Sequence, residues 1–233
     1  MTWDYAGRPL DREINPHFGF EFGGATQLLI SVFDNRETFA NQKFPVRAAQ
    51  LHVSSSWLKW IELAGFFQRG TRINYAPAAG LTPFLGDTTD AFARVTLRPA
   101  ARFALEQSYI FTHLASTASS EGAPHTGRIF SNHLARSKVS LQATRALSLR
   151  AILDYGRIAS DERLTTIVPG MRVSTDFLAT FQVNPWTALY VGYTEGLEDI
   201  ERETGDVLRL RRTADLYRTA RQAFAKASYV LRF

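Results

Sequence analysis

Residues 225–233, with the sequence AKASYVLRF, decide the fold prediction. Odd positions carry Ala, Ala, Tyr, Leu and Phe, whereas even positions carry Lys, Ser, Val and Arg. Because successive side chains of a strand point to opposite faces, this segment is predicted to be a strand with one apolar face. It ends on an aromatic residue, which is unusual for a soluble edge strand but suits a membrane–water interface. The segment therefore favours a transmembrane β-barrel.

The same alternation recurs along most of the chain and identifies the other strands. It is clear where Val95 and Leu97 alternate with Arg94 and Thr96. Several segments, such as residues 170–184, run for at least ten residues without a Gly-Pro interruption. A tilted membrane strand needs about 9–11 residues, whereas ordinary strands average about 5–6. The strand lengths therefore favour membrane strands.

Short and long connections are predicted to alternate, as they do in outer-membrane barrels. Short turns are predicted at residues 23–24, 54–56, 99–101, 145–146 and 184–185. Longer links are predicted at residues 38–44, 75–90, 116–127, 160–169 and 195–220. With residues 2–10 as the first strand, we predict an all-β, antiparallel, up-and-down transmembrane β-barrel of about 12 strands. Residues 1–233 are predicted to form one domain, either a whole barrel or the C-terminal part of a larger one.

The composition agrees with a barrel without requiring one. Hydrophobic residues make up 45% of the chain and charged residues 21%, as expected when a polar lumen dilutes an apolar face. Cys is absent, which excludes disulfides and thiolate metal sites. The net charge is +5, but the 27 Lys and Arg residues are spread through alternating segments, so nucleic-acid binding is not expected.

An outer-membrane barrel must be exported, yet residues 1–5 lack the basic start and apolar core of a signal peptide. No stretch of the sequence reaches the ~18 apolar residues that a membrane helix needs. We therefore expect either that a signal peptide was removed or that the chain is the C-terminal part of a longer protein.

The polar faces of the predicted strands carry charges of both signs, such as Arg150 with Asp154 and Arg172 with Asp176. Basic residues that line a pore raise the local concentration of anions. The alternative is that they pair across neighbouring strands with acids and fill the barrel, the acids being Glu62, Glu106, Asp154 and Asp176. The residues predicted to line the lumen are Arg94, Arg98, Arg136, Lys138, Arg150, Asp154, Arg172 and Asp176. Arg102 and Arg157 belong to the wider basic set.

An acidic cluster lies in the link predicted at residues 195–220 and consists of Glu195, Glu198, Asp199, Glu201, Glu203 and Asp206. Carboxylates suit Ca²⁺, but the cluster lacks the spacing of a preformed calcium loop, which favours a solvated outer loop. Five arginines follow: Arg209, Arg211, Arg212, Arg218 and Arg221. They are expected to pair with these acids or with the phosphates of lipopolysaccharide, which arginine binds in bidentate fashion.

Catalytic chemistry has little support in the sequence. His52 and Ser54 share a strand face and could act as base and nucleophile, but no orienting acid is evident, which favours an ordinary polar pair. His125 and His133 do not have metal-site spacing. No phosphate-binding loop, nucleophile elbow or His-Glu-x-x-His motif is present. We therefore expect no enzyme activity, no cofactor and no metal.

Five segments resemble the C-terminal barrel of a family of bacterial outer-membrane proteins. They are residues 3–16, 69–87, 136–155, 184–196 and 224–233, with sequences such as RGTRINYAPAAGLTPFLGD and NPWTALYVGYTEG. Members of this family usually carry a carbohydrate-binding, family-nine-like β-sandwich before the barrel, and the barrel itself is a domain of unknown function. The resemblance implies a barrel fold, an outer-membrane location and a link to glycans. It implies no catalytic residues.

These observations lead us to expect an outer-membrane scaffold or pore for a glycan or a small anionic solute. Expected partners are outer-membrane lipid, lipopolysaccharide and the barrel assembly machinery. Tyr229, Leu231 and Phe233 are predicted to form the C-terminal membrane-insertion signal. Two alternatives remain: a barrel hydrolase that acts on lipid or glycan, and a soluble β-barrel or sandwich that binds a ligand.

Overall fold

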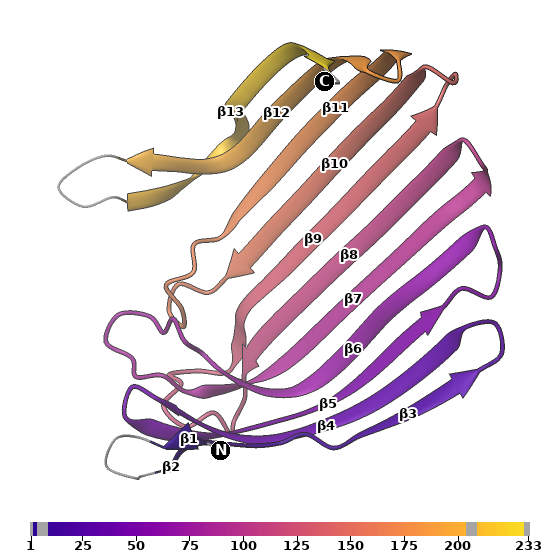
Figure 1. Ribbon diagram of the computed structural model, residues 1–233. Coiled ribbons are helices and arrows are strands. Elements are labelled where there is room, and N and C mark those ends of the chain that lie inside the picture. Colours follow the sequence, from indigo (N-terminus) through magenta and orange to yellow (C-terminus); the bar gives the residue numbers. More distant parts are fainter. Residues whose placement is uncertain (1, 4–8, 204–208, 231–233) are drawn as a thin grey trace.

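The computed structural model describes residues 2–3, 9–203 and 209–230. They form one curved antiparallel sheet with the strand order β1-β2-β4-β5-β6-β7-β8-β9-β10-β11-β12-β13, and β3 also pairs with β4 (Figure 1). The prediction of an all-β, up-and-down fold of about 12 strands is confirmed. Among the described residues, no helix is long and apolar enough to cross a membrane.

The strands are long in the middle of the sheet and short at its N-terminal edge. Their bounds are β1 Thr2–Trp3, β2 Pro9–Ile14, β3 His17–Phe22, β4 Thr26–Phe39, β5 Gln42–Ser55, β6 Ile61–Ile73, β7 Leu85–Ala100, β8 Phe103–Ser116, β9 Gly127–Gln142, β10 Leu147–Ser160, β11 Gly170–Asn184, β12 Thr187–Glu203 and β13 Arg209–Tyr229.

The N-terminal edge differs from the single first strand predicted at residues 2–10. There, β1 pairs with β2, and both β2 and β3 run along β4, one after the other. The interruption falls at Pro16, which has no N–H to donate to the ladder. Its carbonyl oxygen still accepts a 3.0 Å hydrogen bond from the Val32 N–H. β2 and β3 therefore act together as one broken edge strand.

The predicted link at residues 38–44 is also wrong, because β4 and β5 meet in a two-residue hairpin. Phe39 pairs with Gln42, and the turn residues Ala40 and Asn41 have φ angles of 49° and 62°. Positive φ at both central residues is typical of a type I′ turn, which suits the twist of a hairpin. The connection between β4 and β5 is therefore short, where the predicted alternation requires a long one.

The predicted link at residues 195–220 is likewise mostly strand, since β12 and β13 pair over most of their length. Their facing segments carry opposite charges, since Glu195 is aligned with Arg221 and its carboxylate binds Arg218. Opposite charges on neighbouring strands stabilise the pairing, so charged segments can extend a hairpin. The prediction of a link at residues 195–220 was wrong because it treated polar residues as loop residues. Among the described residues, long connections remain at residues 74–84, 117–126 and 161–169.

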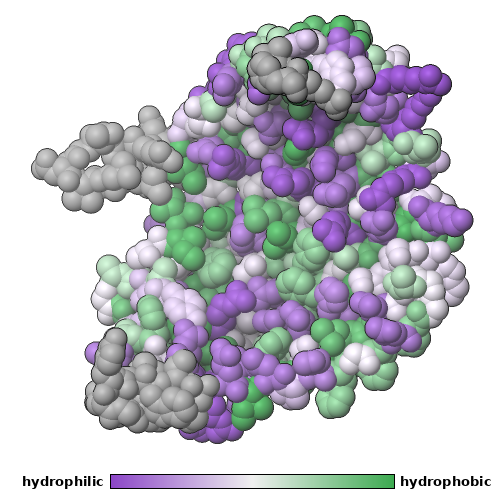
Figure 2. All heavy atoms as spheres, in the orientation of Figure 1, coloured by the Kyte–Doolittle hydropathy of each residue, from purple (hydrophilic) through white to green (hydrophobic). Residues whose placement is uncertain are grey.

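The register divides the side chains between two faces. One face carries Arg94, Arg136 and Asp154, which are aligned across β7 to β10, and we call it the inner face. The outer face carries the alternate residues. Figure 2 shows a hollowed face on which hydrophilic side chains are prominent and hydrophobic ones lie nearer its middle.

The outer face is apolar and exposed from β3 to β12. Phe67 is 50% exposed, Val183 52% and Val191 57%. Other exposed outer-face side chains are Phe18, Phe20, Phe22, Ile30, Val32, Leu51, Val53, Leu63, Leu141, Leu153, Phe177, Phe181 and Leu189. Monomeric soluble proteins rarely expose contiguous apolar surface on this scale, so this face needs a cover.

The sheet has almost no conventional core, because it is a single layer. Within the described residues, the only buried cluster of hydrophobic side chains consists of Phe84, Leu114, Ile129 and Leu164. It lies where the long connections meet the sheet. The two outer strands of the sheet, β1 and β13, are not paired with each other in the described part of the chain. The sheet is therefore open in these residues.

Candidate functional site

The inner face brings together the charged residues that the sequence predicts to line a lumen. Cross-strand alignment joins Arg94 to Arg136 and Asp154 through Ser108, and it joins Lys138 to Asp176 through Ile152. Arg98, Arg150 and Arg172 lie on the same face, because each is an even number of residues from an aligned neighbour on its own strand. All eight residues thus share one surface, and their lining of a pore stays a prediction.

Part of this surface is neutralised by ion pairs between neighbouring strands. Arg136 binds Asp154 through two hydrogen bonds, Nε–Oδ1 at 2.6 Å and Nη2–Oδ2 at 2.8 Å. Arg98 pairs with Glu62, as the alternative to an open basic lumen predicts. Arg172 pairs with Glu198, with Nε and Oε1 3.3 Å apart.

Oppositely charged residues of the same strand do not pair with each other, whereas Asp154 pairs across strands, as the alternative to an open basic lumen predicts. Asp154 binds Arg136 rather than Arg150, and Asp176 accepts a 2.7 Å hydrogen bond from the Thr194 hydroxyl rather than binding Arg172. Two residues that are four positions apart on one strand point to the same face, but the side chain of the residue between them separates them. Direct cross-strand neighbours are closer, so they form the pairs.

Several other cations lie at the end of the inner face where short turns join the strands, which we call the turn side. A hollow of about 660 Å³ lies there, and its basic lining residues are Lys59, Arg98, Arg102 and Arg150. No Asp or Glu lines it. Lys59, Arg102 and Arg150 form no ion pair within the described residues. We call this the basic hollow.

A second hollow, of about 490 Å³, lies farther along the inner face. It is lined by the paired Arg136 and Asp154 together with Arg172, Ile110 and Leu134. Here each arginine has a carboxylate partner. The two hollows therefore share a face but differ in net charge.

The three long connections, at residues 74–84, 117–126 and 161–169, pack at the opposite end of the inner face, which we call the loop side. Phe84 and Leu164 come from two of them and pack on Leu114 and Ile129. Gly86 lies beneath this contact, because an added Cβ would be 3.0 Å from the Ile129 Cδ1 atom. We call this assembly the loop pack.

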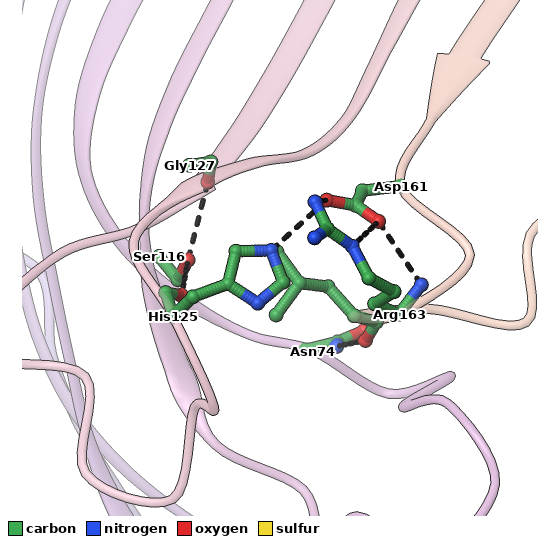
Figure 3. A network of polar contacts seen from close by, with 7 residues as sticks. Asn74, Ser116, His125, Gly127, Asp161 and Arg163 are labelled. Carbon is green, nitrogen blue, oxygen red and sulfur yellow. Dashed lines mark hydrogen bonds and ion pairs between the residues drawn. The ribbon is translucent and has the colours of Figure 1, made fainter.

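Polar contacts join the loop pack internally. The Asn74 side chain donates a 2.8 Å hydrogen bond to the Leu164 carbonyl oxygen, and the Thr165 hydroxyl donates a 2.7 Å bond to that of Ala76. His125 Nε2 lies 3.0 Å from Asp161 Oδ2, which also binds Arg163 at 2.9 Å (Figure 3). Hydrogen bonds from Arg163 and then His125 hold the pKa of Asp161 well below its usual range.

Tyr75 connects the same loops to β4. Its hydroxyl lies 2.8 Å from Glu37 Oε1, and its ring packs edge-on against Phe39 with centroids 5.1 Å apart. Burial, followed by the hydrogen bond to Glu37, raises the pKa of Tyr75 to about 12. The hydroxyl therefore stays protonated and can donate to this carboxylate at neutral pH.

The loop pack contains Ser116, His125 and Asp161, residue types that also occur in hydrolase triads, but their geometry is different. The Ser116 hydroxyl donates to the backbone oxygens of His125 and Gly127, at 2.8 and 3.2 Å. No described hydrogen bond joins this hydroxyl to the His125 imidazole, so it is not a nucleophile held by a base. The arrangement closes a loop rather than building a triad.

The structure places His52 and Ser54 on one strand face, as the sequence predicts. Both lie on the inner face, where His52 is aligned with Leu29 and Phe66, and Ser54 with Gln27 and Ala64. No carboxylate is among these neighbours. His133, the other histidine considered for a metal, lies 2.6 Å from the Tyr109 hydroxyl.

The acidic cluster is a set of strand residues rather than a solvated loop. Glu195, Glu198, Asp199, Glu201 and Glu203 belong to β12, whereas Asp206 lies outside the described residues. Glu195 pairs with Arg218, as expected for the arginines that follow, with Oε1 and Nε 2.6 Å apart. No group of three or more His, Asp or Glu side chains suited to a metal occurs among the described residues.

The predicted insertion signal is only partly visible. Tyr229 ends β13 and is 66% exposed, whereas Leu231 and Phe233 lie outside the described residues. Sequence reasoning missed Lys59 of the basic hollow and Asp161 and Arg163 of the loop pack. The short-range Asp161-Glu162-Arg163 run was the available signal for the last two.

Comparisons with known proteins add no family to this description. No model of a protein family matches the chain, and no curated protein is significantly similar to it.

Proposed function

We propose that this chain is an outer-membrane β-barrel protein, or a contiguous part of one, whose inner face forms a pathway for small anionic solutes. The observation that carries the proposal is the contrast between the faces of a one-layer sheet. Phe67, Phe177 and Val191 of the outer face are exposed, whereas the opposite face carries ion pairs and free cations. Lipid would cover the outer face, and water would fill the inner side.

The preference for anions follows from the uneven charge of the inner face. Several of its acids are occupied by arginines, as in Arg136–Asp154, while Lys59, Arg102 and Arg150 at the turn side have no acidic partner among the described residues. A narrow passage lined by fixed positive charge concentrates anions and repels cations. The link to glycans, which rests on sequence resemblance, gains no support from these side chains.

The membrane part of the proposal is tested by matched lysine substitutions on opposite faces at one depth. Phe177 is on the outer face and is aligned with Tyr193, whereas Thr194 is on the inner face and is aligned with Asp176. A lysine on the lipid face near the midplane costs about 2–4 kcal/mol. We expect Phe177→Lys to reduce assembly in lipid vesicles strongly, whereas Thr194→Lys, next to a carboxylate, assembles normally.

Assembly is measured by heat-modifiable migration on SDS gels and by resistance to carbonate extraction from membranes. Equal assembly of the two variants, together with a wild-type chain that stays soluble after fractionation, would favour the soluble ligand binder. The pathway is tested separately in planar bilayers under a KCl gradient, where we expect a reversal potential that indicates preference for Cl⁻. Preference for K⁺ would contradict an anion pathway, and a silent membrane would leave a scaffold.

A further inference from the structure

The basic hollow has more cations than its surroundings can neutralise. Of its four basic residues, Arg98 alone pairs with an acid among the described residues, through Glu62. Lys59, Arg102 and Arg150 face one cavity without a carboxylate on its lining. Like charges gathered in this way repel one another, and an anion with more than one negative charge would relieve that repulsion.

We propose that the basic hollow is a binding site for a phosphate group or a similar doubly charged oxyanion. Guanidinium groups present fixed donor pairs that match the oxygens of phosphate, and lysine adds a compact point charge. Ser140, Ser148 and Thr180 also line the hollow and supply hydroxyl donors. A monovalent ion such as chloride would use fewer of these donors.

The size of the hollow indicates a phosphate carried by a small organic body. Its volume of about 660 Å³ falls in the range of small-molecule sites, about 300–1,000 Å³, and exceeds what phosphate alone fills. Leu178 and Phe103 add apolar surface next to the donors. The hollow thus combines an anion-binding part with room for a neutral remainder, as a small phosphate monoester requires.

The second hollow shows why this site is specific to one part of the face. Arg136 there already donates two hydrogen bonds to Asp154, so an incoming anion would have to displace a carboxylate. Arg102 and Arg150 have no such competitor in the described structure. The inference deepens the proposed anion pathway and rests on it only for the supply of solutes to this face.

The test uses the full chain refolded in detergent micelles and titrated with inorganic phosphate by calorimetry, at constant ionic strength set with KCl. We expect saturable binding that Arg102→Gln or Arg150→Gln each weakens about tenfold, because each removes a charge-assisted donor pair. Arg150→Lys should restore part of the affinity. Arg69→Gln serves as the control, because Arg69 lies on the outer face of β6.

The outcomes separate the site from the pathway. Phosphate affinity that is unchanged in the Arg102→Gln, Arg150→Gln double variant, with heat-modifiable migration intact, overturns the site even if channels form. Variant-sensitive phosphate binding without conductance supports the site and contradicts the pathway. To identify the source of the phosphate, the titration is repeated with phosphatidylglycerol in the micelles. A variant-sensitive response to this lipid, with none to free phosphate, would identify a lipid headgroup as the ligand, and no response to either would refute the site.

Discussion

The loop side and the turn side are opposite ends of the same strands, but they differ in how far their charged side chains are neutralised by ion pairs. At the loop side, Arg72 binds Asp90 through two hydrogen bonds of 3.2 and 2.8 Å, and Asp161 binds both Arg163 and His125. At the turn side, Arg102 and Arg150 have no acidic partner among the described residues. Paired charges and a small core close one end, while the other end keeps described cations without an acidic partner.

The physical cause of this difference is the length of the connections. Long connections at residues 74–84, 117–126 and 161–169 supply enough chain to fold over the inner face and bury Phe84 and Leu164. The short turn-side connections, such as residues 101–102 between β7 and β8, cannot reach over the face. Only the loop side therefore gains a second layer.

The largest expected effect is on the loop pack. Leu164 is 0% exposed, and Leu164→Ala should lower the free energy of unfolding by about 2–5 kcal/mol, because it leaves a cavity. Leu134→Ala is the matched control, since Leu134 lies on the inner face but is 42% exposed. Urea unfolding in micelles measures both. Equal costs would mean that the loop pack is no better packed than the open face.

Gly86 provides a second way to disturb the loop pack. An added Cβ would lie 2.7 Å from the Ala115 carbonyl oxygen and 3.0 Å from Ile129 Cδ1, so Gly86→Ala should cost about 1–3 kcal/mol. At Gly156 of the inner face the nearest neighbour would be the flexible end of Leu134, at 3.1 Å, and we expect a smaller cost. If thermal unfolding ranks the two variants the other way, the close approach at Gly86 is not a constraint.

The pH dependence of the loop pack follows from Asp161, whose pKa is lowered by Arg163 and His125. A lowered folded-state pKa stabilises the fold above the unfolded value of about 3.9, and this contribution is lost as the pH falls toward the folded value. Asp161→Asn should therefore reduce stability at pH 7 but matter progressively less below about pH 4. A wild-type advantage that stays constant down to pH 2 would exclude this carboxylate as its source.

The smallest effects should distinguish paired from unpaired arginines. The Arg136–Asp154 pair is partly exposed, so Arg136→Gln should cost at most about 1 kcal/mol. Arg150→Gln should change stability by no more than about 0.5 kcal/mol in either direction, because Arg150 has no acidic partner in the described structure. A double-mutant cycle with Asp154→Asn checks the first value. A larger loss at Arg150 would reveal a structural partner and weaken its assignment to ligand binding.

The strand pattern could be predicted because it depends on local alternation. Residues 170–184 were predicted as one strand, and β11 spans Gly170–Asn184. The errors fell on charged segments: residues 195–220 read as a loop because they are polar, yet β12 and β13 pair there and Glu195 binds Arg218 across the hairpin. The sequence of one strand does not show which residues of the neighbouring strand lie opposite it. The ion pairs that neutralise these charges therefore could not be predicted from the sequence.

By itself, the sequence determined the all-β meander, the alternation of apolar and polar faces, and the gathering of Arg94, Arg136 and Asp154 on one face, because side-chain direction along a strand follows from a period of two. Only the tertiary structure decided which charges are neutralised and which stay free. The strand register places Asp154 beside Arg136. The long connections cover one end of the inner face, whereas the short turns leave the other end open. Both depend on residues far apart in the chain, which local patterns do not encode.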